Sequence, residues 1–379
     1  MDDFQVFVKP VGAACNLDCK YCYYLNKQHI ISHDTNFRMP DDLLEEYIVQ
    51  HMNAAAGPEV FFSWHGGEPT LAGLKFFELV VKLQRKHLPE NFTMVNGLQT
   101  NGTLLDHAWC QFLKNENFVV GISLDGPEKF HTANRFRKGG PSCFDEVLRG
   151  YQLLLAYEIP YEILCVVNSG NALYPLEVYR FFKQLNARFI TFLPLVEKQI
   201  SLGKQVSERS VSAIAFGNFL CTIFDEWKKS DIGTVKIQIF EEALRTAFGL
   251  EHTLCIFKKT CGGVPVVERN GDFYSCDHYV NDENRLGNIR KTSLSLFLDS
   301  PAQKAFGQAK LITLPGYCRN CNVKEMCNGA CPKDRFIETP EEEPGLNYLC
   351  EGYKLFFNHC RPFVVQVAEI WRGTSPHQG

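Results

Sequence analysis

The most informative part of this chain is the loop Cys15-Asn16-Leu17-Asp18-Cys19-Lys20-Tyr21-Cys22, which has the spacing C-x3-C-x2-C. Three thiolates on so short a loop can converge on one face of a cubic iron–sulfur cluster. Because a [4Fe–4S] cluster normally takes four cysteine ligands, a motif that offers three leaves one iron open to a small molecule. The alternative is a zinc site, but zinc sites usually pair cysteines as C-x2-C with a second pair nearby, and none follows within about a hundred residues.

Composition limits the classes of protein to which the chain can belong. It has 379 residues, 45% of them hydrophobic, which is enough for one large or two moderate domains. The formal net charge of −4 gives no reason to expect nucleic acid or an anionic membrane as a partner. The opening Met1-Asp2-Asp3 does not resemble a signal peptide, and the longest apolar stretch, near residues 211–224, is interrupted by polar residues. We therefore expect a cytoplasmic protein with no membrane or nucleic acid partner.

The chain has sixteen cysteines, which in a reducing compartment are not expected to form disulfides. Metal or cluster ligation is the remaining explanation for the eleven that fall into spaced groups. The other five are isolated, and we expect them to pack as small apolar residues: Cys110, Cys143, Cys165, Cys221 and Cys360.

Residues 5–193 alternate short apolar runs with amphipathic stretches. The expected strands are Gln5–Val8, Glu59–Ser63, Thr93–Gln99, Val119–Leu124, Tyr161–Val167 and Phe189–Leu193. The expected helices lie near Asp41–Ala56, Leu74–His87, Asp106–Asn115, Phe144–Tyr157 and Leu176–Gln184. This alternation indicates parallel βαβ units, although periodicity alone leaves an open sheet and a partial barrel equally possible. A long helix at about Val211–Lys229 should bury Ile214, Phe216, Phe219, Ile223, Phe224 and Trp227.

Polar motifs follow the ends of the first four expected strands. They are the cysteine loop, Gly66-Gly67-Glu68-Pro69, Gln99-Thr100-Asn101-Gly102, and Ser123 with Asp125 and Gly126. In βα folds this end of the strands carries the site. The two glycines of the second motif let backbone approach a ligand, and the carboxylate beside them can accept hydrogen bonds from an ammonium group. The alternative for that motif is an ordinary Gly-Gly-Pro turn.

A second group of cysteines begins at residue 255. It consists of Cys255, Cys261, Cys276, Cys318, Cys321, Cys327, Cys331 and Cys350. Gly271, between Val264–Glu268 and Asp272–Ser275, predicts a hairpin that returns Cys276 toward Cys261. Eight thiolates match two fully ligated [4Fe–4S] clusters. Zinc is the alternative, but C-x2-C-x5-C-x3-C is not a regular zinc-ribbon spacing.

These motifs resemble the radical S-adenosylmethionine (radical SAM) enzymes with a SPASM extension, and most of all the anaerobic sulfatase-maturating enzymes. The resemblance rests on Val8-Lys9-Pro10, Cys22-Tyr23-Tyr24, Gly66–Gly73, Gln99–Leu104, Ser123–Pro127, Cys276-Asp277-His278-Tyr279, Leu286–Ile289 and Gly345–Cys350. It implies an α/β fold, with a partial (β/α)6 TIM-like radical SAM barrel in residues 1–196. A helical connection in residues 197–235 would lead to a small cysteine-rich SPASM domain with a C-terminal helix in residues 236–379.

The same resemblance implies three [4Fe–4S] clusters and bound S-adenosylmethionine. Cys15, Cys19 and Cys22 would hold the first cluster, Cys255, Cys261, Cys276 and Cys331 the second, and Cys318, Cys321, Cys327 and Cys350 the third. The S-adenosylmethionine contacts would be Tyr21, Gly66, Gly67, Glu68, Ser123, Arg135 and the backbone near Val196. Arg135 could equally be a surface cation. The substrate contacts would be Tyr24, Gln99 and His65, the last of which stands where some family members have Gln.

The implied reaction oxidises a Cys or Ser side chain of a sulfatase to Cα-formylglycine. It removes two electrons, and a 5′-deoxyadenosyl radical takes only one, with a hydrogen atom from Cβ, so the second must pass to an acceptor such as an auxiliary cluster. A base must take the remaining proton, and Asp277, fixed beside Cys276, is the expected base. The alternative for Asp277 is to accept backbone hydrogen bonds in the cluster loop.

The expected partners are an unfolded or nascent sulfatase polypeptide and a low-potential electron donor of the flavodoxin or ferredoxin type. Another SPASM peptide maturase that forms thioether or carbon–carbon crosslinks would need the same clusters. A non-catalytic iron–sulfur electron carrier would need neither an open iron nor the amine site at Gly66–Pro69. The sequence leaves open which sulfatase is modified, whether Cys, Ser or both are accepted, the oligomeric state and the physiological donor.

Overall fold

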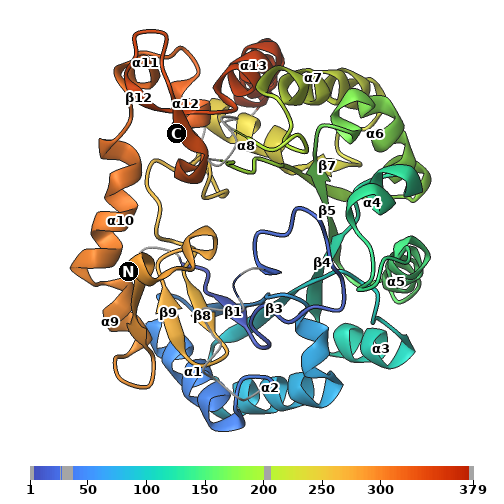
Figure 1. Ribbon diagram of the computed structural model, residues 1–379, viewed down its shortest axis with the longest axis vertical. Helices are drawn as coiled ribbons and strands as arrows, with labels where there is room; N and C mark the ends of the chain where they lie inside the picture. Colours follow the sequence, from blue (N-terminus) through green and yellow to red (C-terminus); the bar gives the residue numbers. More distant parts are fainter. Residues whose placement is uncertain (1–3, 26, 28–36, 200–205, 375–379) are drawn as a thin grey trace. The chain divides into compact units, whose positions relative to one another are not determined.

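The computed structural model describes residues 4–25, 27, 37–199 and 206–374 (Figure 1). Two compact units emerge from the contacts. The first unit comprises Met1–Leu124, His131–Glu162 and Gly262–Gln308, and the second comprises Asp125–Phe130, Ile163–Cys261 and Ala309–Gly379.

The first unit contains the strands β1 to β4, which pair in parallel in chain order, and a hairpin that extends the same sheet beyond β1. Its strand order is β10-β9-β8-β1-β2-β3-β4. The bounds are β1 Phe7–Lys9, β2 Glu59–Trp64, β3 Thr93–Thr100, β4 Phe118–Ser123, β8 Val266–Glu268, β9 Asp272–Tyr274 and β10 Arg285–Asn288. Strand β8 pairs in parallel with β1, whereas β9 and β10 are antiparallel. Because β1 to β4 are parallel, the loops that follow them leave from the same edge of the sheet.

Amphipathic helices cover this part of the sheet. They are α1 Asp41–Ala54, α2 Leu74–His87, α3 His107–Asn115, α5 Phe144–Ala156 and α9 Leu294–Leu298; α4 Glu128–Asn134 and α10 Pro301–Ile312 lie partly in this unit. Figure 1 shows α1 and α2 side by side. Trp64 of β2 is fully buried, with its ring edge-on to Phe76 and Phe77 of α2. The sequence starts α3 through Asp106, whose carboxylate caps the helix by accepting from the Trp109 amide at 2.9 Å.

The second unit joins three further strands to the cysteine-rich segment. Its strands are β5 Tyr161–Val167, β6 Phe189–Pro194 and β7 Lys236–Ile237, all parallel, and a separate antiparallel pair β11 Arg335–Glu338 and β12 Pro344–Asn347. Its helices are α6 Pro175–Gln184, α7 Ala213–Ser230, α8 Gln238–Ala247, α11 Gly316–Arg319, α12 Lys324–Cys327 and α13 Cys350–Thr374. Helices α7 and α13 lie together (Figure 1). They approach so closely that a Cβ on Gly352 would lie 2.1 Å from the Ala213 carbonyl oxygen.

The expected strands and helices of residues 5–193 are present, with ends shifted by no more than two residues. The hairpin turn at Gly271 is confirmed, with a left-handed φ of 86°. The expected buried face of α7 is wrong at Ile214, which is 49% exposed because it lies about half a turn round the helix from the buried Phe216 and Ile223. Four of the isolated cysteines are buried and Cys221 is partly buried. The domain boundaries at residues 196 and 235 stay a prediction.

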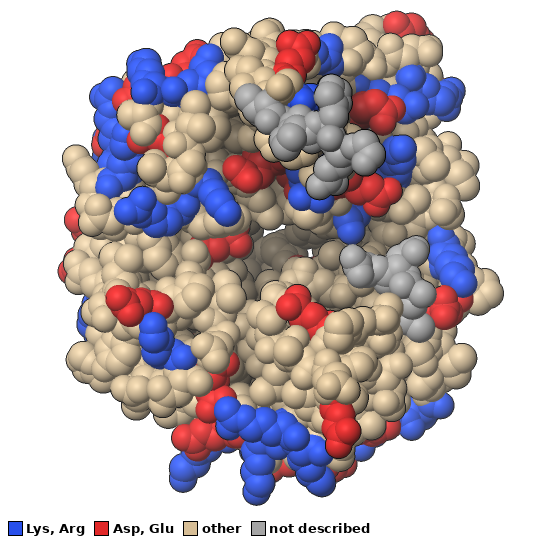
Figure 2. All heavy atoms as spheres, turned by 180° about the vertical axis from the view of Figure 1, so that it is seen from behind, with Lys and Arg blue, Asp and Glu red and all other residues tan. Residues whose placement is uncertain are grey.

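Charge is distributed without a dominant sign on the face drawn in Figure 2, where Lys and Arg side chains are interspersed with Asp and Glu. Among the described residues, none of the helices combines the length and the apolar character needed to cross a membrane.

Candidate active site

The cysteine loop is bound to the loop that follows β2. The Gly67 amide donates to the Gly12 carbonyl oxygen at 2.8 Å, and the Glu68 amide donates to the Ala14 carbonyl oxygen at 2.8 Å. The two backbones approach so closely that a Cβ on Gly67 would lie 2.1 Å from the Ala14 oxygen. Only glycine fits at this position, so Gly67 fixes where the loop of Cys15, Cys19 and Cys22 begins.

Asn16, inside the cysteine loop, ties it to the end of β3. Its side-chain amide donates to the Thr103 hydroxyl at 2.8 Å, and its oxygen accepts from the Asn101 side chain at 2.9 Å. Further along, the amides of Asp18 and Lys20 donate to backbone oxygens of residues 136 and 134 at 2.9 Å each. The cysteines are therefore held by segments far apart in the sequence.

Glu68 is fully buried and is the hub of this region. Its Oε1 accepts from the Thr70 hydroxyl at 2.6 Å and the Thr100 hydroxyl at 2.7 Å, and its Oε2 accepts from the Asn101 amide at 2.7 Å. Burial raises its pKa, and these donors oppose the rise. Glu68 thus fastens the glycine loop to the end of β3, and its expected contact with an ammonium group stays a prediction.

Three more expected cofactor contacts lie in the first unit. The Gln99 side chain donates to the Ser123 hydroxyl at 3.3 Å, which joins the ends of β3 and β4. The Arg135 guanidinium lies over the Tyr21 ring, 5.3 Å from its centroid, and Arg135 is only 8% exposed. Arg135 is therefore a buried cation beside the cysteine loop rather than a surface one.

Asp277 forms a buried ion pair that the sequence did not reveal. The Lys9 Nζ lies 2.5 Å from Asp277 Oδ1, which is the distance of an ion pair, and Lys9 is only 2% exposed. The angles at this contact are not those of a hydrogen bond. The Tyr23 hydroxyl donates to Asp277 Oδ2. Burial would raise the pKa of Asp277, but Lys9, His278 and the Tyr23 hydrogen bond together outweigh it, so the pKa lies well below its usual range. Asp277 is therefore an ionised carboxylate.

The two adjacent tyrosines have different partners. Tyr24 is buried, and its hydroxyl donates to Glu268 rather than to Asp277. The Lys9 Nζ lies 4.2 Å from the centroid of the Tyr24 ring. Burial raises the pKa of the fully enclosed Glu268 to about 8, against the opposing effect of Lys9. The expected substrate contact of Tyr24 stays a prediction, and Tyr23 is the tyrosine that reaches Asp277.

His65 stacks on Phe7, with ring centroids 3.8 Å apart. Desolvation lowers the pKa of His65 to about 3, and the nearby Lys9 adds to this effect. The imidazole of His65 is therefore uncharged, as is the side-chain amide of the Gln expected at this position in some family members.

In the second unit, four of the expected cluster ligands face one small hollow of about 20 Å³. The hollow is lined by Cys318, Cys321, Cys327 and Cys350, together with residues that include Tyr317, Val323 and Lys354. Burial raises the pKa of the Cys327 and Cys350 thiols to about 12. Such thiols ligate a metal only after losing a proton, so they suit a site in which metal binding compensates the thiolate charge.

The other group of expected ligands is divided between the units. Cys255, Cys261 and Cys331 lie in the second unit and are near enough to influence one another electrostatically, whereas Cys276 lies in the first. Val196, just after β6, also lies in the second unit. The proposed ligand set of this cluster and the adenine contact of Val196 stay predictions.

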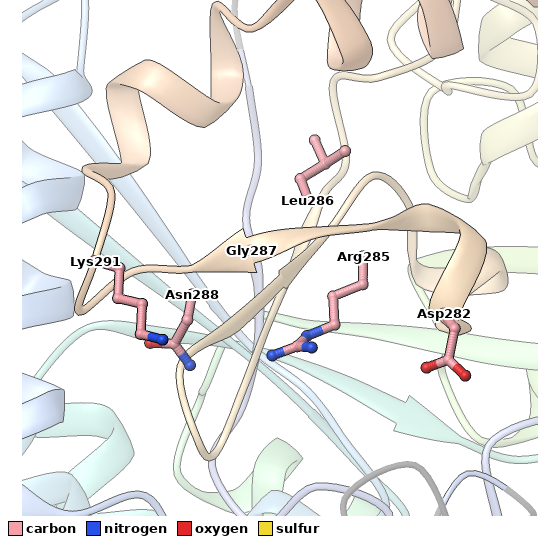
Figure 3. Close-up of a pocket in the computed structure, with 6 residues that line it drawn as sticks. All are labelled: Asp282, Arg285, Leu286, Gly287, Asn288 and Lys291. Atoms are coloured by element: carbon pink, nitrogen blue, oxygen red, sulfur yellow. The ribbon is translucent and has the colours of Figure 1, made fainter.

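A larger hollow of about 400 Å³ lies along the edge strand β10, and none of its lining residues is an expected site residue. Figure 3 shows Arg285 and Asn288 on one side of the strand and Leu286 on the other. Among the described residues, no three His, Cys, Asp or Glu side chains converge tightly enough to hold a single metal ion.

The donor sets fit iron–sulfur clusters, because cysteine thiolates are the ligands that these clusters take. Three cysteines on a loop held from both sides suit an open-iron cluster. The glycine backbone and Arg135 beside that loop suit the polar end of an amino acid.

The fold and the thiol groups define a radical SAM protein with a SPASM domain. Residues 10–171 match the Radical SAM superfamily, and residues 261–322 match the SPASM iron-sulfur cluster-binding domain. The parallel βα arrangement with its cysteine-rich extension is thus confirmed as a radical SAM barrel followed by SPASM.

Relatives along nearly the full chain identify the family more closely. The chain is 43% identical to the Serine-type anaerobic sulfatase-maturating enzyme of Bacteroides thetaiotaomicron, covering 95% of this chain and 90% of that one. It is 35% identical to the Cysteine-type enzyme of Clostridium perfringens strain 13, covering 97% and 99%. The solved structure of native anSMEcpe with bound AdoMet and Kp18Cys peptide superposes with a TM-score of 0.87, at 34% identity over 97% of this chain and 99% of that one. The chain belongs to the anaerobic sulfatase-maturating enzymes, which are radical SAM oxidoreductases.

Sequence reasoning missed Lys9, Tyr23 and Glu268 as members of the site. The motifs Val8-Lys9-Pro10 and Cys22-Tyr23-Tyr24 contain two of them, but only as markers of the family. A basic residue inside an apolar strand, as Lys9 is in β1, was the available signal, because a buried charge requires a partner.

Proposed function

We propose that this protein oxidises the active-site Ser or Cys of a sulfatase polypeptide to Cα-formylglycine. The observation that carries the proposal is the buried ion pair of Lys9 with Asp277, which places the carboxylate beside Cys276 and connects it to the strand that leads into the cysteine loop. The 43% identical relative is Serine-type and favours a serine substrate, although other Serine-type relatives are, at 35%, no more similar than a Cysteine-type one.

The oxidation removes two protons and two electrons from the target side chain. When bound, S-adenosylmethionine and the clusters supply a 5′-deoxyadenosyl radical that takes one hydrogen atom from Cβ, and an acceptor for the second electron. The remaining proton leaves the hydroxyl or thiol for a base. Serine gives the aldehyde directly, whereas cysteine gives a thioaldehyde that water converts to the aldehyde and hydrogen sulfide.

Asp277 is the proposed base. Its carboxylate is ionised and therefore ready to accept a proton, and Lys9 and Tyr23 fix both of its oxygens. The Lys9 ammonium also makes it a weak base, so the transfer depends on loss of the Cβ hydrogen, which acidifies the attached hydroxyl or thiol. Gly66, Gly67, Glu68, Ser123, Arg135, Tyr21 and Val196 are the proposed S-adenosylmethionine contacts, and Gln99, His65 and Tyr24 the proposed substrate contacts.

Two auxiliary [4Fe–4S] clusters are proposed besides the one on the cysteine loop. The shared hollow of Cys318, Cys321, Cys327 and Cys350 supports one of them. Cys255, Cys261, Cys276 and Cys331 are the proposed ligands of the other. A flavodoxin- or ferredoxin-type protein is the proposed electron donor.

Matched peptides test this function. Synthetic sulfatase segments that differ only in Ser or Cys at the target position are incubated anaerobically with the reconstituted protein, S-adenosylmethionine and a reductant, and analysed by mass spectrometry. The proposal expects an aldehyde that reacts with a hydrazine, formed faster from serine. Cleavage of S-adenosylmethionine with both peptides unmodified would contradict it.

A further inference from the structure

Arg335, the first residue of β11, binds the backbone that separates two cluster ligands. Its guanidinium donates to the carbonyl oxygens of Gly329 at 2.8 Å, Asn328 at 2.8 Å and Ala330 at 3.3 Å. These are the three residues between Cys327 and Cys331, and the two cysteines are the proposed ligands of different clusters. A fourth bond, at 2.6 Å, goes to the Lys310 carbonyl oxygen.

The backbone that Arg335 holds is unusual. Asn328, Gly329 and Ala330 all have left-handed φ angles, of 47°, 70° and 50°. Non-glycine residues rarely adopt this conformation, and it persists only where the surroundings enforce it. The Asn328 side chain adds a bond to the Phe257 carbonyl oxygen at 2.8 Å. Arg335 therefore fixes the short connection between the two ligand groups.

Arg335 is partly buried, and Lys310 is a fully buried cation in the same part of the second unit. It is 1% exposed, and its Nζ donates to the carbonyl oxygens of Cys255 at 2.8 Å and Ile256 at 2.9 Å. The sulfurs that act on it electrostatically are those of Cys255, Cys261 and Cys331.

The sulfurs that act on Arg335 come from both groups. They are those of Cys318 and Cys327 and those of Cys261 and Cys331. The acceptors that Lys310 and Arg335 reach in the described part of the chain are backbone carbonyl oxygens, which carry no full negative charge. A buried cation requires a compensating negative charge, and the neighbouring cysteines are the groups that can supply it as thiolates of bound clusters.

We infer that Arg335 and Lys310 are positioning residues that set the reduction potentials of the auxiliary clusters, Arg335 for both and Lys310 for the one bound by Cys255, Cys261 and Cys331. The inference rests on the proposed pair of auxiliary clusters. A fixed positive charge stabilises the reduced, more negative form of a nearby cluster, and in a low-dielectric interior it acts strongly. Both cations would thus make the clusters better acceptors of the electron that leaves the substrate.

The test is a redox titration of the reconstituted full-length protein followed by electron paramagnetic resonance. Arg335→Gln should shift the midpoint potentials of both auxiliary clusters to more negative values. Lys310→Met should shift chiefly one of them. Arg335→Lys keeps the charge but loses the planar fork, so it should keep near wild-type potentials at lower thermal stability. The exposed Arg188→Gln is the control for loss of a surface charge, and should leave the potentials in place.

Each result decides a separate point. Full iron content with unchanged potentials in Arg335→Gln and Lys310→Met would overturn the inference. If Arg335→Gln loses its clusters, Lys310→Met decides alone, since unmoved potentials in that variant would equally overturn it. The variant in which Cys15, Cys19 and Cys22 are all replaced by Ala should keep about eight irons, those of two clusters. A much lower iron content would instead refute the proposed cluster pair.

Discussion

Lys9 and Asp277, 268 positions apart in the sequence, form a buried ion pair with 2.5 Å between Nζ and Oδ1. The pair joins the strand before the cysteine loop to the residue after Cys276. Lys9 of β1 and Tyr23 of the cysteine loop therefore hold the expected base in place and favour its charged form.

Replacing Asp277 by Asn removes the proton acceptor and keeps its size. We expect Asp277→Asn to retain its clusters and to cleave S-adenosylmethionine, while aldehyde formation falls by about 10²-fold or more. Chromatography of 5′-deoxyadenosine and mass spectrometry of the peptide measure the two products separately. The exposed Asp282→Asn is the control. A near wild-type oxidation rate in Asp277→Asn would move the search for the base to His278 or Tyr24.

Glu268 should make stability depend on pH. Burial raises its pKa to about 8, so between its unfolded value and pH 8 the folded state holds a proton that the unfolded state lacks. Stability should therefore fall as pH rises through this window, by at most about 1.4 kcal/mol per pH unit.

Glu268→Gln should remove this dependence. The thermal midpoints of the wild type and of Glu268→Gln, both loaded with clusters, are measured from pH 5 to about 8. They should be similar at the acid end, and the variant should have the higher midpoint at the alkaline end. The exposed Glu341→Gln should follow the wild type. Parallel profiles for the wild type and Glu268→Gln would show that Glu268 is ionised throughout.

A methyl group at Gly67 should displace the cysteine loop. Its Cβ would lie 2.1 Å from the Ala14 carbonyl oxygen, so we expect Gly67→Ala to lose about 1–3 kcal/mol of stability and the iron of the first cluster. Gly57→Ala is the matched control, because no atom lies within 4 Å of its added Cβ. Thermal unfolding and iron analysis report the two effects. Normal iron content in Gly67→Ala would show that the loop tolerates the shift.

The cluster count follows from the eleven grouped cysteines. Fully loaded protein should contain about twelve irons per chain, and the Cys15, Cys19 and Cys22→Ala variant about eight, with no 5′-deoxyadenosine formed. Metal analysis of anaerobic samples measures this. S-adenosylmethionine cleavage by the triple variant would show that the first loop does not hold the active cluster.

Local patterns predicted the sheet, its helices and the glycine loop, because strand and helix periods and turn residues act over short distances. The partners of Lys9 and Glu268 could not be predicted, since their contacts join β1 and β8 to residues elsewhere in the chain. Tyr23 and Tyr24 are chemically equivalent neighbours, and only the packing decides which hydroxyl meets Asp277. Ile214 was placed wrongly because the predicted set of buried residues did not follow the helical period, which puts Ile214 opposite Phe216 and Ile223.

The source of the hydrogen in 5′-deoxyadenosine tests the central claim most directly. The protein is incubated with a sulfatase peptide in which deuterium replaces both Cβ hydrogens of the target Ser. The 5′-deoxyadenosine and the peptide are then analysed by mass spectrometry. Oxidation at Cβ predicts one deuterium in the 5′-deoxyadenosine and an aldehyde that retains the other. Unlabelled 5′-deoxyadenosine from a peptide that is nevertheless oxidised would contradict the account.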